Sequence, residues 1–131
     1  MTAVHELRVS RTASAATPKT IRYALDAFLK KLALPDDRRE DIILAVGEAL
    51  ANAAEHAYAA QAAHEAELIE LHAVASPDGR RIAVEIKDSG SFVEPTPHDD
   101  RGFGFHIMRS IAHEVAIETG AGTRVRLIFE Q

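Results

Sequence analysis

The pattern of apolar and polar residues predicts an alternation of strands and helices along the chain. Apolar residues recur at helical spacing between residue 17 and about residue 33, which predicts an amphipathic helix. Its apolar stripe consists of Ile21, Ala24, Leu25, Phe28, Leu29 and Leu32. A longer helix is predicted at roughly 36–60 and a shorter one at about 104–113. Alternating segments predict strands at 4–10, 67–75, 80–88, 113–119 and 122–130.

Turn and breaker residues mark the boundaries of these elements. Thr17-Pro18 predicts the start of the first helix, with Thr as the N-cap and Pro in the first turn. Asp36, after Pro35, predicts the cap of the long helix. Pro77-Asp78-Gly79 is a turn signal between two predicted strands and favours an antiparallel hairpin. The order strand-helix-helix-strand-strand-helix-strand-strand indicates an α+β layer rather than a doubly wound parallel sheet.

The long helix carries polar side chains within an otherwise apolar stretch. Between Ile42 and Ala54 only Glu48 and Asn52 are polar, and His56 continues the same face at four-residue spacing. The predicted apolar stripe consists of Ile43, Val46, Leu50, Ala53 and Ala57. A helix that is apolar nearly all round is usually buried, and a buried carboxylate or amide needs a partner. These side chains therefore either bind something or belong to a solvated face on which Ala fills the remaining positions.

Composition narrows the class of protein. The 131 residues, 47% of them hydrophobic, fit one domain spanning 1–131. No apolar run approaches the ~20 residues of a membrane span, and no signal peptide is visible, so no membrane association is expected. The absence of cysteine excludes disulfides and is compatible with the cytoplasm, which is the compartment we expect. The net charge of -5 argues against direct nucleic-acid binding. Seven histidines form no HxxxH or HxH pair, so no His-based metal site is expected.

Three further segments are candidates for ligand contact. Asp88-Ser89-Gly90 ends a predicted strand, and it reads either as a turn or as an acceptor carboxylate beside a glycine that lets a ligand approach. Arg101-Gly102-Phe103-Gly104 precedes a predicted helix. Free N–H groups and a charged donor there suit phosphate, and a flexible connector is the alternative. Gly122-Thr123 starts the last strand and is compatible with a simple turn.

Together these segments form an ordered set, namely ExxxN on a helix, then DxG, RGxG before a helix, and GT. This set resembles the ATP-binding fold shared by DNA gyrase, Hsp90, histidine kinases and MutL, the GHKL superfamily. Within it, the chain is most similar to the small anti-sigma-factor serine/threonine kinases of bacterial partner-switching systems. GEALANAAEHAY resembles their N box, DSGSF their first glycine box, RGFGFHIMRSIAHEV their second and GTRVRLIF their closing strand. The resemblance implies a two-layer α/β sandwich of the Bergerat type, with a mixed, mainly antiparallel sheet and helices on one face.

The resemblance also implies a role for each candidate residue. Asn52 is expected to supply an oxygen ligand to Mg²⁺ on ATP or ADP, and Glu48 to act as the general base. Asp88 and Gly90 are expected to contact adenine, with Thr123 completing that network through a water. The phosphates are assigned to Arg101, Gly102 and Gly104. Residues 91–101 are expected to form a lid, and His56 is as compatible with a structural role as with a place near the phosphates.

The function implied is phosphorylation of a Ser or Thr on a STAS-fold anti-anti-sigma factor by a kinase that, as a homodimer, also binds and sequesters a sigma factor. Two alternatives remain open at this point. One is a kinase of a STAS scaffold that controls a PP2C-type phosphatase, and the other is a nucleotide-binding regulator with little kinase activity. The exposed edge expected for strand 4–10 offers modest support for the dimer.

One departure from the family pattern lies after the second glycine box. The family has Met-Asp-x-Val there, whereas this chain has Ala112-His113-Glu114-Val115. We know of no nucleotide contact from that Asp. The change therefore bears on partner contacts or helix capping more than on ATP binding.

Overall fold

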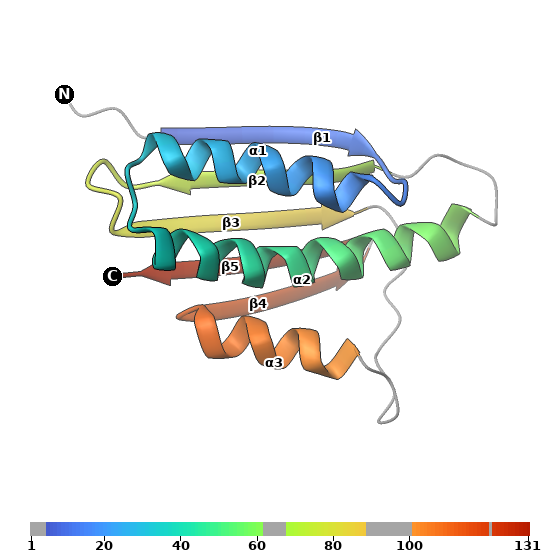
Figure 1. The fold of residues 1–131 in the computed structure, drawn as a ribbon. Helices are drawn as coiled ribbons and strands as arrows, with labels where there is room; N and C mark the ends of the chain where they lie inside the picture. Colours follow the sequence, from blue (N-terminus) through green and yellow to red (C-terminus); the bar gives the residue numbers. More distant parts are fainter. Residues whose placement is uncertain (1–4, 62–67, 89–100, 121) are drawn as a thin grey trace.

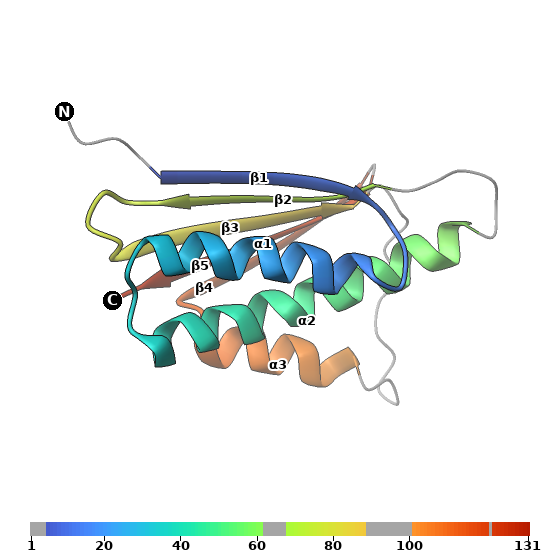
Figure 2. The same cartoon turned by 45° about the horizontal axis from the view of Figure 1, so that its top comes forward.

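The computed structural model describes residues 5–61, 68–88, 101–120 and 122–131, without the side chains of 56–61 and 101–104. One sheet has the strand order β1-β2-β3-β5-β4. Within these residues three helices are present, and the helices cover one face of the sheet (Figures 1 and 2). The elements are β1 (His5–Thr12), α1 (Thr17–Lys31), α2 (Asp36–Gln61), β2 (Leu68–Ala75), β3 (Arg81–Asp88), α3 (Arg101–Ile111), β4 (Glu114–Gly120) and β5 (Gly122–Glu130).

The predicted order of elements and the α+β class are confirmed. The predicted hairpin forms between β2 and β3, and its turn contains Gly79 at a φ of 73°, a conformation that glycine adopts without strain. All four pairings among the five strands are antiparallel, so the expectation of a mixed sheet is wrong for the part that the structure describes. No helix in the described ranges is long and apolar enough to cross a membrane.

The core lies between the sheet and the helices. On α1 the predicted stripe is correct, because Ile21, Leu25 and Leu29 are fully buried. On α2 the stripe is rotated from the predicted one. The buried positions are Ile42, Ala45, Val46, Ala49, Leu50 and Ala53. A helix made largely of Ala and Leu gives little information about which side faces the sheet, and α2 leaves Leu44 51% exposed.

Thr17 does not cap α1, contrary to the prediction. The N-cap position is Ala16, which makes no side-chain capping bond, and Pro occupies the first turn as expected. The Thr17 hydroxyl instead donates to Thr12 O at 2.7 Å and accepts from Ser14 N at 2.8 Å. It therefore fixes the turn between β1 and α1 rather than the free N–H groups of the helix.

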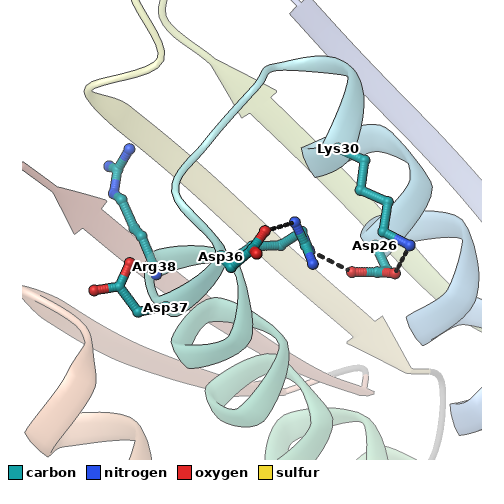
Figure 3. A network of polar contacts seen from close by, with 6 residues as sticks. Asp26, Lys30, Asp36, Asp37 and Arg38 are labelled. Carbon is teal, nitrogen blue, oxygen red and sulfur yellow. Dashed lines mark hydrogen bonds and ion pairs between the residues drawn. The ribbon is translucent and has the colours of Figure 1, made fainter.

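The start of α2 is fixed to α1 and to the β2–β3 turn by side chains that form several bonds each. Figure 3 shows Asp26 and Lys30 of α1 beside the first turn of α2. The Arg39 guanidinium bonds to Asp36 at 2.8 Å and to Asp26 at 3.0 Å, and these carboxylates raise its pKa, Asp36 most strongly. Arg38 donates to Gly79 O at 2.6 Å and to Arg80 O at 2.8 Å, and burial lowers its pKa.

Candidate functional site

Two buried polar residues face each other across neighbouring strands. Asp88 ends β3, Thr123 lies at the start of β5, and the two are paired in the register. Each is only 3% exposed. The Thr123 hydroxyl Oγ1 is buried and has no hydrogen-bond partner among the described residues. A buried hydroxyl without a partner costs free energy, so this atom is suited to a ligand or an ordered water.

The alternation of β3 explains why Asp88 is buried. Ile82, Val84 and Ile86 point into the core, and Asp88 continues this series at the strand end. The same alternation on β5 places Thr123 on the core side with Val125. Both polar groups therefore lie on the helix-covered face of the sheet, where α2 packs.

Glu48 and Asn52 lie on successive turns of α2 and are both half-buried. Within the described part of the chain, neither side chain has a hydrogen-bond or ion-pair partner. Glu48 also lines a groove of about 430 Å³ between α1 and α2. Both side chains are therefore partly accessible and available to a ligand, and their roles in the site stay predictions.

The helix after the second glycine segment begins earlier than predicted. α3 starts at Arg101 rather than near residue 104, so Gly102 and Gly104 lie inside its first turn instead of preceding it. The first four N–H groups of an α-helix have no partner within the helix, so the phosphate interpretation still has donors available. Gly90 and residues 91–100 of the expected lid lie outside the described residues, as do the side chains of Arg101 and His56.

These segments meet at one end of the molecule. The end of β3, the start of β5, the second half of α2 and the first turn of α3 all lie at the same end of the layers (Figures 1 and 2). The structure thus brings together the elements that carry Asn52, Asp88, Arg101 and Thr123. Glu48 lies one helical turn before Asn52, closer to the middle of α2.

The geometry agrees with a comparison of the sequence with known families. The family model of the histidine kinase-like ATPase domain matches residues 11–129. The chain belongs to this family. Family membership implies a site for ATP, which the polar end of the sandwich can provide. A comparison with curated proteins finds no match.

A solved structure supports the same fold. The chain is similar to the crystal structure of the RsbU and RsbW domains of Rv1364c from Mycobacterium tuberculosis, with a TM-score of 0.74 and 23% sequence identity. The similarity covers 95% of this chain and 32% of that chain, so this histidine kinase-like domain spans about a third of the matched protein. A sequence identity of 23% supports a shared fold and does not by itself assign an activity.

One residue near Glu48, Arg22, is not found by sequence reasoning. Arg22 of α1 lies across α2 at Gly47, where an added Cβ would be 3.6 Å from Arg22 Cδ. Both line the groove with Glu48. In the sequence, Arg22 is an ordinary polar residue on the outer face of an amphipathic helix. Only the packing of α1 on α2 brings it beside the N-box segment.

Proposed function

We propose that the chain is an ATP-dependent serine/threonine kinase of the anti-sigma type. The observation that carries this proposal is the buried Thr123 hydroxyl opposite Asp88, which has no hydrogen-bond partner among the described residues. Thr123 lies at the start of β5, and this strand begins at the end of the molecule where the second half of α2 and the first turn of α3 lie (Figure 1). These two segments resemble the N box and the second glycine box. A nucleotide base needs hydrogen-bonding groups, so a strand end that was apolar, or whose polar groups all had protein partners, would not favour its binding.

The residues present fit ATP with Mg²⁺. Asp88 is an acceptor for the adenine amino group, and Thr123 completes that contact through a water. Asn52 offers a carboxamide oxygen, the ligand type that Mg²⁺ takes, and it has no competing partner in the described ranges. Gly90, Gly102 and Gly104 allow close approach to the nucleotide, and Arg101 provides a charge for the phosphates. When bound there, Mg²⁺ would neutralise charge on the phosphates.

The transfer step uses Glu48. The hydroxyl oxygen of a substrate Ser or Thr forms a bond to the γ-phosphorus of ATP. The bond from that phosphorus to the β–γ bridging oxygen breaks, and ADP leaves with the electron pair. Glu48 accepts the proton of the hydroxyl, a contribution of about 10²–10⁴-fold for general-base catalysis.

A protein substrate is consistent with the surroundings of Glu48. The groove between α1 and α2 is open to solvent and is lined by charged and apolar side chains, among them Arg22, Glu40 and the exposed Leu44. A folded partner can bring a hydroxyl to the surface of such a groove. By the resemblance to anti-sigma kinases, we assign this partner as a STAS-fold anti-anti-sigma factor, with a sigma factor as the competing ligand and the cytoplasm as the compartment.

The proposed homodimer uses the edge of the sheet. β1 lies at one end of the strand order and pairs only with β2 among the described strands. An unpaired edge can associate with another chain. Light scattering over a concentration series, with and without nucleotide, decides between dimer and monomer. A monomeric mass at high concentration contradicts the dimer and favours the alternative of a kinase acting on a STAS scaffold.

Glu48→Gln and Asp88→Asn test the two halves of the proposal separately. We expect Glu48→Gln to bind ATP with native affinity and to transfer phosphate about 10²–10⁴-fold more slowly, because the amide cannot accept the proton. We expect Asp88→Asn to weaken ATP binding measured by calorimetry, because an amide replaces a pure acceptor. Transfer at the native rate by Glu48→Gln to a STAS protein rules out its role as the base. Unchanged affinity in Asp88→Asn removes Asp88 from the adenine contact.

A further inference from the structure

The helix-covered face of the sheet ends in a row of three polar side chains. Residues that pair directly across neighbouring antiparallel strands point to the same face, so each row runs across β3, β5 and β4. The successive rows are Val84, Leu127 and Val115, then Ile86, Val125 and Ile117, then Asp88, Thr123 and Thr119. The first two rows are apolar and belong to the core or pack against it. The third row is therefore the place where this face changes from apolar to polar.

Thr119 is the member of this row that lies at the edge of the sheet. It pairs directly with Thr123, and β4 is the outermost strand on this side. Thr119 is exposed, and its hydroxyl has no hydrogen-bond partner in the described part of the chain. Thr123 is only 3% exposed, and its Oγ1 likewise has no partner among these residues. Two adjacent hydroxyls without partners, one buried and one at the rim, are suited to bind a ligand or water between them.

The spacing of the two hydroxyls suits one bridging water. The Cβ atoms of directly paired residues lie about 4.5–5.5 Å apart, and the two hydroxyls form no direct hydrogen bond. Both threonines line a cavity of about 160 Å³ together with Gly120 and Gly122, which carry no side chains and leave the rim of the sheet open. The cavity also borders charged side chains of the opposite face, namely Lys87, Glu118 and Arg124. A bound water needs only a small part of this volume.

We propose that Thr119 is a positioning residue for adenine, because its hydroxyl and that of Thr123 together hold one ordered water at the base. The proposal rests on the proposed nucleotide site and names the residue that fixes the water through which Thr123 acts. With Asp88 accepting from the adenine amino group, the ring nitrogen N1 is the next hydrogen-bonding atom along the same edge of the base. N1 of adenine carries no proton, so the water accepts from the hydroxyls and donates to N1.

ATP binding measured by calorimetry tests the proposal with Thr119→Val and Thr119→Ser. Valine keeps the branched shape at an exposed strand position, so the unfolding midpoint should not change. The affinity for ATP should fall by about threefold, the equivalent of a weak hydrogen bond. Serine keeps the hydroxyl, so its affinity for ATP should stay close to that of wild type. Thr12→Val is the matched control, because Thr12 is an exposed threonine at the end of β1 on the other edge of the sheet, and it should leave the affinity unchanged.

An ATP analogue in which a C–H group replaces N1 identifies the atom of the base that the water contacts. This analogue, 1-deaza-ATP, cannot accept a hydrogen bond at that position. We therefore expect wild type and Thr119→Val to bind 1-deaza-ATP with equal affinity, although they differ in their affinity for ATP. If Thr119→Val loses the same factor of affinity for both ligands, the contact with N1 is wrong and the positioning role is overturned.

A double-mutant cycle tests whether the two hydroxyls share one water. We expect Thr123→Val alone to lower the affinity for ATP by about fivefold, and the addition of Thr119→Val to cause little further loss because the water is already gone. Independent contacts would instead multiply to a loss of about fifteenfold. A fifteenfold loss in the double variant, or native affinity in Thr119→Val, overturns the role of Thr119 and leaves the proposed function intact. A wild-type protein that binds no ATP contradicts the proposed function, and this inference with it.

Discussion

Two buried threonines have opposite hydrogen-bond environments. Thr17 and Thr123 are each 3% exposed. The Thr17 hydroxyl has partners on every side, donating to Thr12 O and accepting from Ser14 N, with Ser14 Oγ 3.0 Å away. The Thr123 hydroxyl has none among the described residues. Both threonines are equally shielded from water, so the difference lies in the hydrogen-bond partners that the fold provides for each hydroxyl. This difference indicates that only the Thr17 hydroxyl is needed for the fold itself.

The same contrast extends to the regions around them. At the start of α2, Arg38 and Arg39 each bond to two acceptors. Further along α2, Glu48 and Asn52 have no partner in the described part of the chain. Polar groups that hold elements together have several partners each, whereas Glu48, Asn52 and the Thr123 hydroxyl have none among the described residues. Some substitutions should therefore lower the free energy of unfolding, and others should lower the affinity for ATP.

The largest effect on stability is expected for Thr17→Val. Valine keeps the shape but leaves Thr12 O and Ser14 N without their partner, so the free energy of unfolding should fall by about 2 kcal/mol. Denaturant unfolding followed by circular dichroism measures this. Thr20→Val is the control, since Thr20 is exposed and its hydroxyl donates to no described residue other than Ala16 O at the N-cap of α1. Equal effects of the two substitutions would mean that the Thr17 network adds nothing beyond a helical threonine.

A smaller loss is expected for Arg38→Met, which keeps much of the apolar stem and removes two bonds to backbone carbonyls. Partial exposure weakens such bonds, so we expect a loss of about 1 kcal/mol in the same unfolding assay. Arg126→Met is the control, because Arg126 is exposed and forms no hydrogen bond or ion pair with any described residue. An unchanged unfolding midpoint in Arg38→Met would show that the β2–β3 turn needs no fastening to α2.

The smallest effect on stability is expected for Thr123→Val. The Thr123 hydroxyl has no partner among the described residues. Replacing it by a methyl group should therefore change the free energy of unfolding by less than about 0.5 kcal/mol, or raise it. ATP affinity should nevertheless fall by about fivefold, the equivalent of one hydrogen bond. A loss of stability as large as that of Thr17→Val would mean that Thr123 has a structural partner, and the comparison between the two residues would fail.

Sequence reasoning predicts the elements well, for reasons seen in particular residues. The β3 alternation and the Pro77-Asp78-Gly79 turn define the hairpin, and the α1 stripe is clear because polar residues occupy its other faces. On α2 the prediction is partly right, because Val46, Leu50 and Ala53 are buried as expected. Ala and Leu surround this helix, however, and only packing decides that Ile42 rather than Ile43 is fully buried. The prediction of a mixed sheet is also wrong for the described strands, because the direction in which two strands pair depends on how segments distant in sequence meet in the fold.

The candidate site is predicted as a set of segments, but not as an arrangement. The order of the boxes along the chain does not reveal that Asp88 and Thr123 are directly paired, because that follows from the β3–β5 register. The role of Thr17 is also hidden, since a threonine before proline looks like a cap whether its hydroxyl turns toward the helix or toward the preceding strand. Arg22 acquires significance only through its contact with an element that is remote in sequence. The sequence marks His113 as a departure from the family pattern, but it does not reveal the bonds of this residue to β5.

The position of β1 has a consequence for folding kinetics. Its partner is β2, and the pairing of His5 with Ala75 encloses both α1 and α2 in the intervening chain. By contrast, β2–β3 and β4–β5 are hairpins that close over short turns. Because long-range pairing must overcome more chain entropy before it is rewarded, we expect β1 to join the sheet last during folding. As an edge strand it should also be the first to detach, so its amides should exchange with solvent before those of the central β3.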